Sequence, residues 1–149
     1  MSGAPYVSIL DGWNHLARRE NLIRGTDEYK QRKKEYISTR VLHDFLAHFG
    51  GDPESLEAWR GICQVTGVKN VTNLTTIRMC RSALEKKHCN IIDLVDAANT
   101  GGKARTFKTR RALAHYTMET EKYFPKDAAK GVPLLEEFLV EVFKSYTRR

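Results

Sequence analysis

The sequence predicts an all-α protein, folded as a compact bundle of about six to eight short-to-medium helices. Apolar side chains recur at intervals of three and four residues along most of the 149-residue chain, as one face of a helix requires. Capping residues stand before these stretches and glycines stand after them. A hydrophobic content of 41% with only four prolines is typical of a globular chain. We expect one helical domain over residues 1–149, in which residues 1–40 can form an N-terminal helical extension.

Two helices are expected before residue 50. Residues 6–17 place apolar side chains on one face of a helix that should end near Gly25. Thr26 is the expected N-cap of the second helix, because two carboxylates follow it where the helix dipole favours negative charge. Ser38 or Thr39 would divide this helix in two, and the glycine pair that begins at residue 50 would end it.

The region 53–87 predicts a pair of helices that resembles a helix–turn–helix. Asp52-Pro53-Glu54 combines a cap, a proline suited to the first helical position and an acid. Gly67 would end this first helix, and Asn73 or Thr72 would cap the second. In a DNA-binding helix–turn–helix, the second helix enters the major groove. The connector after Gly67 is longer than the usual turn, which favours the alternative of two packed helices with a basic outer face.

Three more helices are expected in the last third. Asn90 would cap the first of them, which should end at the break Asn99-Thr-Gly-Gly102. Thr109 would cap the next helix, and Pro133 would open the last one. The apolar stripe of that last helix extends to Phe143, and cations follow it at Lys144, Arg148 and Arg149. Residues 68–71 could also pair briefly as a strand.

Positive charge is concentrated in the middle third of the chain. The chain holds 25 Lys and Arg against 18 Asp and Glu, for a formal net charge of +7, and residues 76–111 contain nine of these cations but only three acids. Such an excess attracts polyanions. We therefore expect DNA or RNA as the partner. The expected phosphate contacts are Arg78, Arg81, Lys86, Lys87, Lys103, Arg105, Lys108, Arg110 and Arg111.

Two basic segments leave alternatives open. Phe107 stands among the cations of residues 103–111, where it would either stack on a base or anchor the segment in the core. Residues 30–34 are also basic, and pairs such as Glu28 with Arg32 favour a solvated helix face there. A nuclear localisation patch is the alternative for that stretch.

The sequence predicts a binding module without catalytic activity, cofactor, metal or small-molecule substrate. It has no Gly-rich phosphate loop and no nucleophile elbow, and the spacing of His and Cys does not match a zinc site. The odd number of cysteines argues against a disulfide framework. The start of the chain does not resemble a signal peptide, and no apolar run is long enough to cross a membrane. We expect an intracellular protein, in the nucleus or cytoplasm, with no membrane partner.

A protein–protein interaction or scaffold module is the alternative function. Such a module would bind a protein partner, or a second copy of itself, through an exposed apolar helix face. The two candidate faces are the N-terminal helix with Trp13 and the last helix with Phe138 and Phe143.

A series of spaced residues over about 40–145 resembles a group of small, uncharacterised helical proteins of filamentous fungi. The resemblance rests on core and cap residues and on no catalytic motif. It implies a eukaryotic intracellular origin and a conserved helical fold, and it assigns no site residues. The residues that carry it are Trp59-Arg60, Ile77 to Lys87, Asn90 to Asp96, Phe107, Leu113, Tyr116-Thr117, Tyr123 to Lys126, Ala129-Lys130 and the Leu-rich helix that closes the chain.

Overall fold

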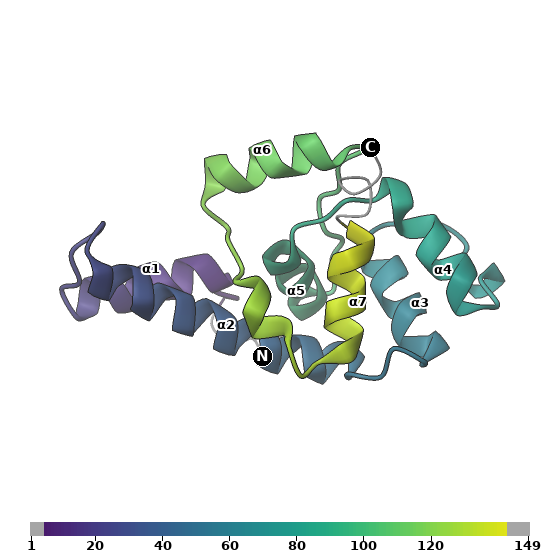
Figure 1. Cartoon of the computed structure of the whole chain (residues 1–149), viewed down its shortest axis with the longest axis horizontal. Helices are drawn as coiled ribbons and strands as arrows, with labels where there is room; N and C mark the ends of the chain where they lie inside the picture. The colour runs from purple at the N-terminus through teal and green to yellow at the C-terminus, as the bar shows by residue number, and fades with distance from the viewer. Residues whose placement is uncertain (1–4, 143–149) are drawn as a thin grey trace.

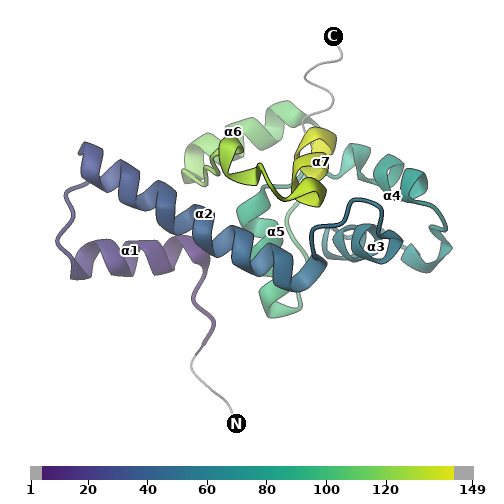
Figure 2. The same cartoon turned by 60° about the horizontal axis from the view of Figure 1, so that its bottom comes forward.

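The computed structural model describes residues 5–142, and this part of the chain is all-α (Figures 1 and 2). It contains seven α-helices and no strand, which confirms the predicted fold class. The predicted Phe143, Lys144, Arg148 and Arg149 lie outside the described residues. The α-helices are α1 (Ile9–Arg19), α2 (Asp27–Phe49), α3 (Leu56–Val65), α4 (Ile77–Ala83), α5 (Ile91–Thr100), α6 (Arg110–Thr120) and α7 (Pro133–Val142). Three short 3-10 helices are η1 (Val71–Asn73), η2 (Leu84–Lys86) and η3 (Lys126–Ala129).

Helices α1 and α2 form a hairpin whose far end projects from the rest of the bundle (Figures 1 and 2). The hairpin has a small core of its own, made of Trp13, Ala17 and Tyr29. The ring centroids of Trp13 and Tyr29 are 5.2 Å apart in an edge-on arrangement. The second half of α2 instead enters the main core, where Phe45 is fully buried together with side chains of α3, α5 and α7. The boundary of the extension at residue 40 therefore falls inside one continuous helix.

Several helix ends match the local signals in the sequence. The side chain of Thr26 accepts a hydrogen bond from Tyr29 N at 3.2 Å. Thr109 accepts one from Ala112 N at 3.1 Å. Gly101 ends α5 in the left-handed conformation, with φ of 75°. These capping interactions are local, so the sequence alone was sufficient to predict them.

The predicted start of α3 was wrong by several residues. Ser55 is the N-cap, and its hydroxyl accepts from Ala58 N at 3.1 Å. Asp52 instead closes a turn, because its carboxylate accepts from Glu54 N at 2.9 Å. The carbonyl of Pro53 accepts a hydrogen bond from Trp59 Nε1 at 2.9 Å, which ties this turn to the buried indole. The cap–proline–acid motif thus forms a turn that precedes the helix.

Other predicted boundaries were also wrong. The first helix occupies Ile9–Arg19 and ends before residue 25, and α2 continues past Ser38 and Thr39 without a break. Neither Thr72 nor Asn73 caps α4, since both belong to η1. Thr76 is the cap, and it accepts from Met79 N at 3.1 Å.

The three cysteines are free and buried. Cys63 lies beside α4, and its thiol donates to Cys80 O at 3.5 Å. Burial raises the pKa of Cys63 to about 12. None of the helices in residues 5–142 is long and apolar enough to cross a membrane.

Candidate polyanion-binding surface

An isolated antiparallel β-bridge joins two of the basic segments. His88 N donates to Phe107 O at 3.0 Å, and Phe107 N donates to His88 O at 2.8 Å. The bridge is also tied to α7, because Nδ1 of the buried His88 imidazole lies 2.7 Å from Val142 O. A carbonyl oxygen only accepts, so Nδ1 carries the proton in this contact. The brief pairing considered for residues 68–71 is absent from the described residues, and this bridge is the pairing found there.

Lys87 directly precedes His88 and Lys108 directly follows Phe107, so the bridge brings the segments that carry these two lysines side by side. Lys108 is exposed, and Lys87 is half-buried. The neighbouring Lys86, Arg105 and Arg111 are exposed as well. We call this group the basic surface; it consists of Lys86, Lys87, Arg105, Lys108 and Arg111.

Aromatic rings support the position of Arg105 on this surface. Its guanidinium carbon lies 5.0 Å from the ring centroid of Phe107 and 5.2 Å from that of Tyr116. Phe107 itself packs against the main core, and its ring centroid is 4.9 Å from that of Tyr116. Of the two interpretations of Phe107, the structure thus favours the core anchor. Cation–π contacts hold the Arg105 side chain in place without neutralising its charge.

Two of the three acids in residues 76–111 are bound within the fold. Asp93 accepts hydrogen bonds from the Tyr116 hydroxyl at 2.5 Å and from Lys122 Nζ at 2.7 Å. Asp96 accepts from the Tyr6 hydroxyl at 2.6 Å. Burial, together with the hydrogen bond to Asp96, raises the pKa of Tyr6 to about 12. Both carboxylates are therefore engaged by other residues of the fold.

Arg81 does not face outward as the helical pattern predicted. Its guanidinium donates to Glu141 and Glu137 of α7 and lies 4.9 Å from the ring centroid of Trp59. The sequence spacing within α4 cannot show this contact, because α7 lies about sixty residues later in the chain. Arg81 therefore links two helices, and its charge is compensated.

The other predicted cations lie in different surroundings. Arg110 is buried, although it begins α6. Lys103 is exposed, and its amine donates to Gln64 O at 3.4 Å near the end of α3. Arg78 is exposed on α4. The basic surface, as defined above, thus contains five of the nine predicted cations, and it does not include Arg78, Arg81, Lys103 or Arg110.

Two of the three apolar residues named for protein docking lie inside the fold, and the third, Phe143, is outside the described residues. Trp13 and Phe138 are both fully buried, so neither is presented to a partner. The described part of the chain holds no group of three or more His, Cys, Asp or Glu side chains that could bind a metal ion.

The described residues combine an all-α bundle with an exposed group of cations on a bridged pair of segments. No family model, curated protein or solved structure matches this chain.

Sequence reasoning missed a second basic region. Lys33 was grouped with a solvated helix face, yet its amine lies 3.9 Å from a carboxylate oxygen of Glu121 and 3.4 Å from the Glu121 carbonyl oxygen. Lys33 and Tyr29 share one face of α2, since they are four residues apart. The spacing of Tyr29 and Lys33 was the only sequence signal of this basic region. That spacing did not indicate the segment after α6, whose Glu121 contacts Lys33.

Proposed function

We propose that this chain is a non-enzymatic nucleic-acid-binding module that contacts phosphates through the basic surface. The observation that carries the proposal is the β-bridge between His88 and Phe107, which joins the segment that contains Lys87 to the segment that contains Lys108. Like charges placed side by side repel, and bound phosphate would relieve that repulsion. An intracellular location, in the nucleus or cytoplasm, belongs to the same proposal.

The surroundings of the basic surface support this role. Arg105 is positioned by two rings, and Asp93 is compensated by Lys122. Arg111 lies in the first turn of α6, where the helix dipole adds positive potential. Phosphate contacts position a protein on a duplex but carry no sequence information. We therefore propose binding with little sequence preference.

The test is a titration of fluorescently labelled duplex and single-stranded oligonucleotides at several salt concentrations. The double variant Lys87→Gln/Lys108→Gln should weaken binding at low salt and reduce the slope of log affinity against log salt by about 2, because each lost phosphate contact removes about 0.9 from that slope. The matched control is Arg19→Gln/Lys130→Gln, which removes two exposed cations elsewhere and should leave the slope nearly unchanged.

Two results would contradict the proposal. The first is an absence of oligonucleotide binding at low salt. The second is an equal effect of both double variants, since binding would then reflect net charge and not this surface. A protein partner that survives nuclease and high salt would support the interaction module in its place.

A further inference from the structure

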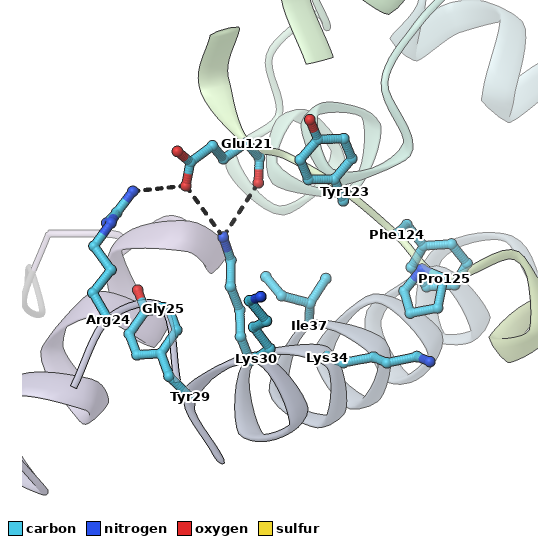
Figure 3. A pocket seen from close by; sticks show the side chains of 11 residues that line it. Arg24, Gly25, Tyr29, Lys30, Lys34, Ile37, Glu121, Tyr123, Phe124 and Pro125 are labelled. Carbon is cyan, nitrogen blue, oxygen red and sulfur yellow. Dashed lines mark hydrogen bonds and ion pairs between the residues drawn. The ribbon is translucent and has the colours of Figure 1, made fainter. Parts of the chain in front are cut away.

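A second feature of the structure is a groove of about 570 Å³ between α2 and the segment after α6 (Figure 3). Tyr29 and Ile37 of α2 line one side, and both are largely buried. Tyr123, Phe124 and Pro125 line the other side. Figure 3 shows Arg24 and Glu121 at one end of the groove and Phe124 and Pro125 at the other. Its size lies within the range of small-ligand sites.

The groove carries a positive charge that its single acid only partly offsets. Four cations line it, namely Arg24, Lys30, Lys33 and Lys34, against one carboxylate, Glu121. Glu121 pairs with Arg24 at 2.7 Å and with Lys33 at 3.9 Å. Lys30 and Lys34 are exposed and lie one helical turn apart along the same edge. Either amine could pair with an anionic group of a ligand.

The apolar part of the groove is mainly aromatic. Tyr123 is 54% exposed. An aromatic side chain of this size is usually buried in a core or an interface. Ile37 is the one aliphatic side chain among the lining residues, apart from the proline ring. A flat ring gains its contact by stacking on such a surface, whereas an acyl chain needs an enclosed aliphatic channel.

We infer that this groove binds a phosphorylated nucleobase, with the base against Tyr123 and the phosphate at Lys30 and Lys34. The ligand is either a free nucleotide or one nucleotide of a single strand. The site lies near the C-terminal end of α6, whereas the basic surface adjoins the N-terminal end of that helix. The inference therefore does not depend on the proposed phosphate contacts at the bridge.

The first experiment compares adenosine monophosphate with adenosine, inorganic phosphate and octanoate by calorimetry on the full chain. Adenosine monophosphate should bind about tenfold more tightly than either of its parts, because base and phosphate are held together. Amide NMR shifts should change at Tyr29, Ile37 and residues 121–124. Tighter binding of octanoate, or shift changes elsewhere only, would overturn the inference.

Variants then separate the two contacts. Tyr123→Ala should weaken adenosine monophosphate about tenfold and leave the weak binding of inorganic phosphate unchanged. Lys30→Gln/Lys34→Gln should weaken both ligands. All three side chains are exposed, so these variants should fold, as circular dichroism and thermal unfolding can verify. Unchanged adenosine monophosphate affinity in the Tyr123 variant would overturn the inference.

Two further measurements identify the source of the nucleotide and separate this site from the other. A short single-stranded oligonucleotide that competes with adenosine monophosphate, and is weakened by Tyr123→Ala, indicates a strand as the ligand; failure to compete indicates a free nucleotide. Lys87→Gln/Lys108→Gln should leave adenosine monophosphate binding unchanged. A loss of that binding in the bridge variant would show that the groove is not the site.

Discussion

Arg81 donates a hydrogen bond from Nε to Oε1 of Glu141 across 2.7 Å, and the Glu141 side chain is only 2% exposed. The pair connects α4 to α7, whose sequences are about sixty residues apart. Glu137, one turn before Glu141, accepts a second bond from the same guanidinium. Arg81 therefore holds α4 against α7, while Arg78 on the same helix stays exposed to solvent.

We expect Arg81→Ala to lower the free energy of unfolding by about 3 kcal/mol, because it removes the guanidinium that pairs with the buried carboxylate of Glu141. Urea unfolding followed by circular dichroism measures the change. Arg78→Ala, on the exposed side of the same helix, is the matched control and should change stability by less than about 0.5 kcal/mol. Equal losses in the two variants would contradict a specific role for the Arg81 pair.

Asn90 provides a second stability prediction. Its side chain caps α5 by accepting from Ile92 N at 2.9 Å, and its amide donates to Thr117 Oγ1 and Lys122 O. We expect Asn90→Ala to cost about 2 kcal/mol, since a cap is worth about 1 kcal/mol and a buried carbonyl also loses its donor. Asn90→Asp keeps the cap acceptor and loses both donors, so its unfolding midpoint should not exceed the parent value.

Asp44 should make stability depend on pH. Burial alone would raise its pKa, but hydrogen bonds from His43 and Asn99 and the neighbouring Arg40 outweigh burial and lower the pKa of Asp44 below its usual value. A carboxyl with a lowered pKa stabilises the fold above its unfolded pKa of about 3.9 and loses this contribution as pH falls through the folded value.

Asp44→Asn should therefore cost about 1 kcal/mol at about pH 7, and this difference should shrink below about pH 4. Urea midpoints across that range measure the change. The control is Asp127→Asn. The Asp127 side chain is 88% exposed, so this variant should leave the dependence of stability on pH in the acidic range unchanged. A difference between Asp44→Asn and the parent that stays constant with pH would contradict this assignment.

Gly12 lies where α1 approaches α2 closely. A Cβ atom there would overlap the Tyr36 hydroxyl oxygen and would lie 3.3 Å from its Cζ. Alanine favours helices by about 1 kcal/mol over glycine. We nevertheless expect Gly12→Ala to lower the thermal midpoint, because the Tyr36 ring must move. Adding Tyr36→Leu should recover part of that loss, and a stabilised single variant would show that the ring yields freely.

The sequence was sufficient for features set by neighbouring residues. The caps Thr26, Asn90 and Thr109 act within three residues of themselves, and the amphipathic pattern defines each helix separately. The sequence was insufficient where contacts between distant residues determine the local structure. The turn before α3 is closed partly by Trp59, which the cap–proline–acid motif does not reveal.

The candidate sites show the same division. Composition located the excess charge in residues 76–111, but it did not show which way each cation points. The inward turn of Arg81 depends on α7, and the approach of the two basic segments depends on the bridge between His88 and Phe107, which are nineteen residues apart. The groove required both α2 and residues 121–125, whose contact no local pattern encodes.

The 23-residue helix α2 extends over about 34 Å, at 1.5 Å per residue, and its two halves belong to cores of unequal size. Tyr29 relies on a cluster of three buried residues, whereas Phe45 sits within the large one. One secondary-structure element therefore spans two cooperative units. Amide protons near Tyr29 can exchange with solvent through local opening of the hairpin. Those near Phe45 exchange only when the whole bundle unfolds.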